Sequence, residues 1–150
     1  MNHSPRKFTV SGEPLGYYAM GKTPNWERKR RYHAWCLRVR VAALQAGIAL
    51  PLVATKGRPL WLKTLAFFRD GRHCDPENTH KGVKDALFYS GAVKIRNAGA
   101  LTISNGKSRK KPKGGDKYTG GAYAPPLYDP QNPRVEIEIK PAPPAGGKET

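Results

Sequence analysis

The spacing of apolar residues predicts an opening strand followed by a long helix. The run Phe8–Val10 is suited to a short strand, which the turn residues from Gly12 onward would end. Over residues 27–45 apolar side chains recur every three or four positions, the spacing of a helix with one buried stripe. Gly47 is typical of the residue that ends such a helix. The stripe consists of Tyr32, Trp35, Cys36, Val39, Ala42 and Ala43, and the opposite face carries Arg28, Arg31 and Arg38.

The rest of the chain contains further strands, a second helix and irregular segments. Leu60–Phe68 is almost continuously apolar, which is typical of a strand covered on both faces. A second helix is predicted from Asp75 to about Phe88, and residues 101–103 form another candidate strand. Val135–Ile139 alternates apolar and charged residues, which predicts a half-exposed strand. Residues 105–133 contain glycine pairs, several prolines and the run KSRKKPK, and are expected to form a basic loop.

This order of elements predicts a single domain of the α/β (α+β) class. Strand, helix, strand, helix, strand and strand follow one another in 150 residues, a length typical of one domain. We therefore expect a small mixed sheet covered by two main helices, over residues 1–140. Residues 141–150 are rich in Pro, Gly and Ala and are expected to form a disordered tail.

The charge of the chain narrows the kinds of partner it can have. It has 27 Lys and Arg against 11 Asp and Glu, a formal net charge of +16, which indicates a polyanion such as nucleic acid or an anionic membrane surface. Residues 22–40 hold seven basic residues and one acidic residue, and residues 107–117 hold six and one. No apolar run approaches the roughly 18 residues of a membrane span, and no signal-peptide pattern is present. Cys36 and Cys74 lack the spacing of a disulfide framework or a zinc site, so a reducing, cytoplasmic location is expected.

An acidic cluster in this basic chain supplies the candidate chemistry. Asp75 and Glu77 stand two residues apart where a buried strand leads into the second helix, so both carboxylates can converge on one divalent cation. Mg²⁺ takes oxygen ligands and needs only one or two protein carboxylates beside water and substrate phosphate. Lys81 and Asp85 follow at helical spacing, which places Lys81 between two carboxylates, where it can orient them or contact a phosphate or an attacking water. Binding a polyanion does not require such a cluster, whereas metal-assisted hydrolysis of a phosphodiester does.

The same residues also have a purely structural interpretation. Asp75 before Pro76 is a good helix cap, and Glu77 in the first turn suits the helix dipole. The spacing of Lys81 from Glu77 and from Asp85 is that of ordinary ion pairs on a helix surface. From the residues alone, capping and pairing are favoured over a metal site.

Weaker candidates lie around this cluster. His73 and His80 flank the acids and either is a candidate base, although histidines near a turn are more often simply surface residues. Cys74 has no base paired with it and is expected to pack. The pair Tyr17-Tyr18 can stack on unpaired bases or pack against the domain.

The segment Cys74–Leu87 resembles the signature of the RusA family of Holliday junction resolvases. Its sequence, CDPENTHKGVKDAL, follows the family pattern D-x-D-N-x-x-K-x-x-x-D-A-L, with Glu77 in place of the second aspartate. The resemblance extends over most of residues 7–140. Its supporting parts are the opening strand with its G-x-P turn (Phe8–Pro14), Tyr32, Trp35 and the closing strand (Val135–Ile139).

The resemblance implies an activity and a set of residue roles. RusA-like proteins are small homodimeric α/β nucleases, often of phage or prophage origin, which nick four-way DNA junctions symmetrically with Mg²⁺ held by aspartates. Asp75 and Glu77 would be the metal ligands, Lys81 the active-site lysine and Asp85 the last aspartate of the motif. Mn²⁺ is the alternative metal. A homodimer is expected, because paired nicks in a two-fold symmetric junction need two active sites.

One position departs from the family pattern. RusA-like chains follow the motif helix with an Asp-Asp pair, one member of which completes the metal site. Here that pair falls at Arg96-Asn97, and no acid follows Asp85 before Asp116. Either Asn97 or Asp70 supplies the third ligand, or metal binding is weakened, or the protein binds junctions without cutting them well.

These observations predict a Mg²⁺-dependent, structure-specific DNA endonuclease that resolves Holliday junctions or other branched DNA. The alternative is a junction-binding protein of the same fold in which catalysis is weakened or lost. An RNA-binding protein is a third interpretation, which the lack of an aromatic RNA-binding strand disfavours. A bacterial or phage-encoded protein is expected, with neither a membrane partner nor a small-molecule cofactor. The expected DNA contacts are Lys29, Arg30, Arg31, Arg38, Arg72, Lys107, Arg109, Lys110, Lys111 and Lys113.

Overall fold

The computed structural model describes five stretches of the chain. These are residues 6–16, 26–88, 93–96, 100–103 and 118–142. The basic segment at 107–117, with five of the expected DNA contacts, lies outside the described residues, as do Tyr17-Tyr18 and residues 143–150 of the tail expected at 141–150; the first tail residue, Pro141, instead ends the last strand.

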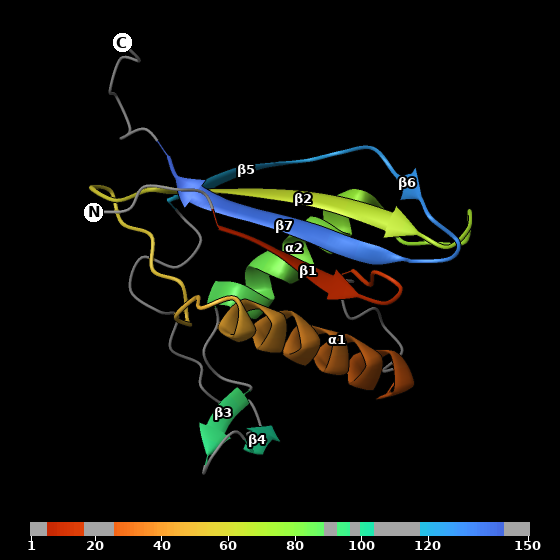
Figure 1. Ribbon diagram of the computed structural model, residues 1–150, viewed down its shortest axis with the longest axis horizontal. Helices are drawn as coiled ribbons and strands as arrows, with labels where there is room; N and C mark the ends of the chain where they lie inside the picture. Colours follow the sequence, from red (N-terminus) through yellow and green to blue (C-terminus); the bar gives the residue numbers. More distant parts are fainter. Residues whose placement is uncertain (1–5, 17–25, 89–92, 97–99, 104–117, 143–150) are drawn as a thin grey trace.

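A mixed five-stranded sheet forms the centre of the molecule (Figure 1). Its strand order is β1-β7-β2-β5, and β6 extends the sheet beside the end of β2. β7 pairs antiparallel with β1 on one side and with β2 on the other, whereas β2 pairs in parallel with β5 and β6. The strands are β1 (Arg6–Ser11), β2 (Leu60–Phe68), β5 (Thr119–Tyr123), β6 (Leu127–Tyr128) and β7 (Arg134–Pro141).

Two helices pack on one face of this sheet and bury its alternate side chains. Helix α1 (Trp26–Gln45) contacts β1 and α2, and helix α2 (Pro76–Phe88) contacts β2 and β5. The core between helices and sheet contains Phe8, Val10, Trp35, Val39, Leu62, Val83, Leu87, Val135 and Ile137. The predicted α+β fold with a small mixed sheet and two main helices is therefore confirmed (Figure 1).

The predictions for the helix and strand limits hold closely for the first half of the chain. The stripe on α1 is buried as expected, with Trp35 2% exposed and Val39 fully buried. Gly47 has a φ of +83°, the left-handed conformation that favours glycine after a helix, and the N–H of Ile48 donates to the carbonyl of Ala43.

The expectation that β2 is covered on both faces by packed elements is wrong. Leu62, Thr64, Ala66 and Phe68 are buried under the helices, but Lys63 on the other face is exposed. The half-buried residues on that face are covered by residues of the neighbouring strands rather than by another layer. Trp61 lies against Gly120 of β5, and the Arg134 guanidinium lies 3.8 Å from the centre of the Phe67 ring.

The predicted loop at 105–133 is also wrong in part, because residues 119–123 and 127–128 form β5 and β6. The glycines of β5 and the prolines between the two strands suggested irregular structure, but strand pairing with β2 overrides that local preference. Gly121 shows why glycine is suited there, since a Cβ at this position would lie 2.3 Å from the carbonyl oxygen of Leu62. A separate hairpin, β3 (Val93–Arg96) paired with β4 (Ala100–Ile103), contains the expected strand at 101–103 and one that the sequence pattern missed.

Candidate functional site

The acidic motif of Asp75, Glu77 and Asp85 begins at the residue before α2, after β2 and a short, mostly exposed turn. Asp75 Oδ1 accepts a hydrogen bond from the N–H of Glu77 at 3.1 Å, and the Asp75 carbonyl accepts from the N–H groups of Asn78 and Thr79. Pro76, which has no N–H, is the first helical residue. Asp75 is thus the helix cap that its sequence context predicted, and its side chain remains exposed.

Glu77 and Lys81 lie side by side on the exposed face of α2. Their carboxylate oxygen and Nζ are 3.8 Å apart, and each side chain is about half exposed (51% and 55%). A pair of this kind is weakly held, because water screens both charges and both side chains lose rotamer freedom. Lys81 therefore lies near the Glu77 carboxylate, one of the two expected beside it, and its exposed amine is accessible to a phosphate from solvent.

Asp85 has a different environment from the other two acids of the motif. It is half-buried and accepts a hydrogen bond from the Tyr32 hydroxyl of α1 at 3.0 Å. Eight residues of helix separate it from Glu77, which corresponds to roughly 12 Å along the axis. The structure joins Glu77 with Lys81 but places Asp85 at the contact between the two helices.

Asp75 and Glu77 have the donor chemistry that Mg²⁺ requires. The cap bond uses one oxygen of Asp75, and both side chains are exposed, so carboxylate oxygens face solvent at the first turn. Within the described residues, no three His, Cys, Asp or Glu side chains gather as a metal site. Asp70, one candidate third ligand, is exposed, and its Oδ1 accepts from the Arg72 N–H at 2.8 Å; the other, Asn97, lies outside the described residues.

His73 fixes the chain just before the acidic motif. Its Nδ1 is 2.7 Å from the Cys74 carbonyl, which can only accept, so Nδ1 carries the proton. Nε2 lies 2.8 Å from the Tyr128 hydroxyl, and the ring stacks on Phe68 at 3.9 Å. These contacts give His73 a positioning role for the turn that presents Asp75.

His80 points into the sheet. Its Nδ1 lies 2.9 Å from the hydroxyl of the buried Thr64, and its ring packs near Tyr123. Burial, with a smaller contribution from the charge of Lys84, lowers the pKa of His80 to about 4. His80 is therefore neutral near pH 7 and lies between α2 and the strands β2 and β5.

The cysteines belong to the packing. Cys74 is half-buried with its Sγ 3.1 Å from the Thr79 hydroxyl, and burial raises the pKa of its thiol. Cys36 is buried, which raises the pKa of its thiol to about 11, and both cysteines are free. The expectation that Cys74 packs is confirmed.

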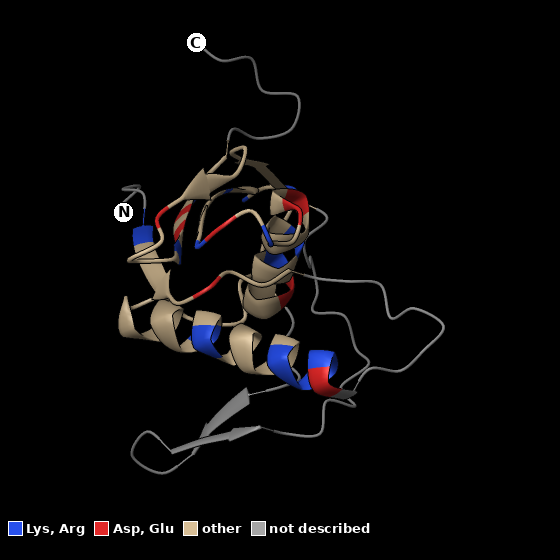
Figure 2. Ribbon diagram, turned by 90° about the vertical axis from the view of Figure 1, so that its right-hand side faces the viewer, with Lys and Arg blue, Asp and Glu red and all other residues tan. Residues whose placement is uncertain are grey.

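Lys and Arg positions recur along α1, which packs against α2 (Figure 2). Arg30 and Arg31 are exposed, and Lys29 is half-exposed; Arg31 pairs with Glu27 at 2.7 Å. Arg72 is exposed in the turn before α2. The open face of the sheet differs, because Glu136 and Glu138 alternate along its β7 strand.

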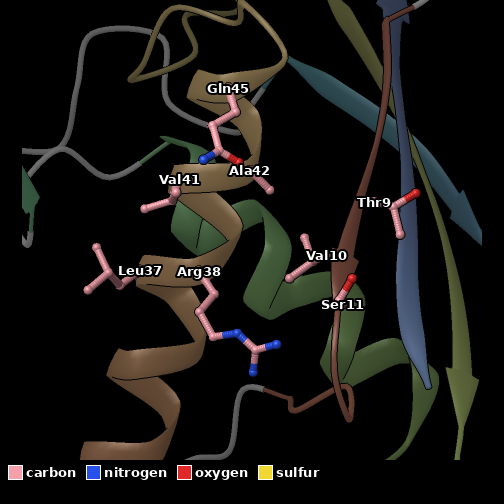
Figure 3. Close-up of a pocket in the computed structure, with 8 residues that line it drawn as sticks. All are labelled: Thr9, Val10, Ser11, Leu37, Arg38, Val41, Ala42 and Gln45. Atoms are coloured by element: carbon pink, nitrogen blue, oxygen red, sulfur yellow. The ribbon is translucent and has the colours of Figure 1, made fainter. Parts of the chain in front are cut away.

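Arg38 lies apart from the other expected DNA contacts. It borders a hollow of about 460 Å³ between β1 and α1, with Val10, Leu37 and Val41 among its neighbours (Figure 3). Its guanidinium lies against the Gly12 turn, where an added Cβ would be 2.3 Å from Nη2. Gly12 has a φ of +105°, so glycine suits both the backbone and this close approach.

The sequence matches none of the protein-family models and none of the curated proteins with which it was compared. Among the described residues, no helix is long and apolar enough to cross a membrane.

Two contacts around the site join residues that are far apart in the sequence, and no motif predicted either pair. Tyr32 and Asp85 are 53 residues apart, and His73 and Tyr128 are 55 apart, so neither pair shares an element. Only the helical stripe that places Tyr32 on the inner side of α1 pointed to the first contact.

Proposed function

We propose that this protein is a RusA-like, Mg²⁺-dependent endonuclease acting on four-way or otherwise branched DNA. The observation that carries the proposal is the exposed group of Asp75, Glu77 and Lys81 around the first two turns of α2, which packs against a basic helix in a chain of charge +16. Mn²⁺ is the alternative metal. The resemblance of residues 74–87 to the RusA signature supports the same assignment.

Each residue of the group has a distinct role in the proposed reaction. Asp75 and Glu77 would hold the cation, which supplies neutralisation of charge at phosphorus and a more acidic water. Lys81 contacts a non-bridging phosphate oxygen or orients the attacking water. The helix cap fixes Asp75, and His73 braces the turn before it, so the Asp75 carboxylate is positioned before DNA binds.

The DNA arms lie along α1 and the adjacent turn. Lys29, Arg30, Arg31 and Arg72 contact phosphates there, while Arg38 meets an arm near the β1 turn. Further phosphate contacts come from the basic segment, through Lys107, Arg109, Lys110, Lys111 and Lys113. The protein acts as a homodimer, because a two-fold junction requires two active sites, and it works in the cytoplasm of a bacterium, encoded there or by a phage.

The experiment is cleavage of a synthetic four-way junction by the full chain. Wild type is expected to produce paired nicks with Mg²⁺ and none with EDTA. Asp75→Asn and Glu77→Gln are expected to lose at least a hundredfold in rate while keeping junction affinity. Asparagine is also a strong helix cap, so Asp75→Asn retains the fold, and Glu138→Gln on the open sheet face is the matched control that keeps full activity. If wild type binds the junction and leaves it intact in Mg²⁺ and in Mn²⁺, the nuclease assignment is wrong.

A second function is supported by the partners that Asp75 and Glu77 have within the protein itself. Asp75 caps α2 and Glu77 pairs with Lys81, so a protein that only binds junctions has a structural use for both acids. Such a protein binds branched DNA tightly in low salt and forms no product. Asp75→Asn and Glu77→Gln would then leave every measured DNA property unchanged.

A further inference from the structure

A hollow of about 420 Å³ lies at the start of α2, on the side facing α1. Its wall is made by Leu15 and Gly16 after β1, by Arg28, Arg31 and Tyr32 of α1, and by Cys74 and Asn78 around the helix start. The volume lies within the range of small-molecule sites and suits a sugar-phosphate unit.

Two arginines give the hollow its charge. Arg28 and Arg31 are one turn apart on α1 and are exposed, so the hollow is reached from solvent. Among its described lining residues these two are charged and none is acidic. Glu27, which is not a lining residue, pairs with Arg31. Both side chains are largely exposed (68% for Arg31 and 72% for Glu27), so the pair is weak and a phosphate can replace the Glu27 carboxylate. Arginine presents a planar fork of donors that matches phosphate oxygens.

One side of the hollow is formed where Gly16 packs closely against the start of α2. An added Cβ on Gly16 would lie 2.9 Å from the Asn78 Cβ and 3.0 Å from the Cys74 Sγ, so the chain after β1 packs tightly there. Cys74 and Asn78 flank Asp75 and Glu77 in the sequence. A phosphate in the hollow would therefore lie at the same end of α2 as Asp75 and Glu77.

We propose that this hollow binds a backbone phosphate of nucleic acid, clamped by Arg28 and Arg31, and thereby sets which neighbouring phosphodiester meets Asp75 and Glu77. The inference rests on the proposed function for its ligand class, nucleic acid. It adds a defined binding subsite whose described lining contains neither Asp75 nor Glu77.

The test compares two double variants of the full chain, each lacking two positive charges. Arg28→Gln/Arg31→Gln removes the clamp, and Lys56→Gln/Arg58→Gln removes two exposed charges from the turn at 55–58 as the matched control. Affinity for a fluorescent four-way junction is measured by anisotropy in EDTA over a range of NaCl concentrations. The clamp variant is expected to bind at least tenfold more weakly at about 0.1 M salt, with a salt slope shallower by about 1 to 2, and the control is expected to match wild type.

A chemical footprint locates the phosphate. Cys74 lines the hollow and Cys36 is buried, so mass spectrometry after alkylation reports each thiol separately. Junction DNA is expected to slow alkylation of Cys74 severalfold in wild type and not in the clamp variant. Equal protection by millimolar inorganic phosphate alone would show a free-anion site and overturn the nucleic-acid assignment.

The outcomes separate this inference from the proposed nuclease function. Equal affinity and equal salt slope in the two double variants overturn the hollow as a phosphate site, whether or not wild type cuts DNA. Loss of binding in the clamp variant alone supports it, even if no junction is ever cleaved. A wild type that binds no DNA overturns both.

Discussion

The Tyr32 hydroxyl donates a hydrogen bond to an Asp85 carboxylate oxygen at 3.0 Å and so ties α1 to α2. Lys29, Arg30 and Arg31 lie on α1 and the acidic residues at α2, and this contact joins the two helices together with the bond from Arg40 to the Ala86 carbonyl. Burial raises the pKa of the Tyr32 phenol, with a further contribution from the neighbouring Cys36 and Asp85, so the hydroxyl keeps its proton and acts as the donor.

Removing this hydrogen bond is expected to destabilise the fold. Tyr32→Phe leaves a half-buried carboxylate without that donor, so the free energy of unfolding should fall by about 1 to 2 kcal/mol. Asp85→Asn should cost a similar amount, and a double-mutant cycle should show coupling of about 1 kcal/mol. Urea unfolding measures all three values. Additive losses with no coupling would contradict the structural role given to this pair.

The cap at Asp75 makes a prediction about stability that is separate from catalysis. Asp75→Ala removes the acceptor for the Glu77 N–H and should lower the free energy of unfolding by about 1 kcal/mol, whereas Asp75→Asn should be nearly neutral. Thermal unfolding of the two variants beside wild type tests this. Equal loss in both variants would show that the charge, rather than the cap geometry, stabilises the start of α2.

His80 predicts a loss of stability as the solution becomes acidic. Its pKa is about 4 in the folded protein and 6.5 as the ordinary value, so between these values the unfolded chain binds a proton that the folded chain does not. The stability is complete above pH 6.5 and declines as pH falls toward 4. In His80→Asn this part of the pH dependence should shrink, by roughly 1 kcal/mol once solvent screening is allowed for. The measurement is the urea midpoint of wild type and His80→Asn at pH 7 and at pH 5. Carboxylates titrate in both proteins and so cancel in the comparison. If the midpoint falls by the same amount between pH 7 and pH 5 in both, the assignment to His80 is contradicted.

The parts of the fold that depend on local periodicity were predicted from the sequence. The stripe of α1, the alternation in β7 and the cap of α2 each require only neighbouring residues, and all three are confirmed. β5 and β6 could not be found in this way. The glycines of β5 and the prolines just before β6 have low strand preference, and the conformation of both strands comes from pairing with β2, which is distant in sequence.

The candidate site shows the same division. Asp75, Glu77 and Lys81 share one helix start, so their spacing was enough to group them, and the Glu77–Lys81 contact is present. Asp85 has the same helical spacing, but its environment is decided by Tyr32 on another helix. The hollow between Gly16, α1 and α2 joins three segments and has no linear signature.

Gly16 and Gly57 form a matched pair for testing how tightly the hollow is built. A Cβ on Gly16 would meet the Asn78 Cβ at 2.9 Å and the Asn78 backbone carbon at 3.0 Å, while a Cβ on Gly57 would meet nothing within 4 Å. Gly16→Ala must therefore push the chain after β1 away from α2, and it should cost about 1 to 3 kcal/mol of stability. Gly57→Ala in the exposed turn should stay within about 0.5 kcal/mol of wild type. Urea unfolding gives both values. Because backbone lines this contact, no side-chain rotation can relieve it, so a Gly16→Ala protein as stable as Gly57→Ala would contradict the close packing of this segment on the start of α2.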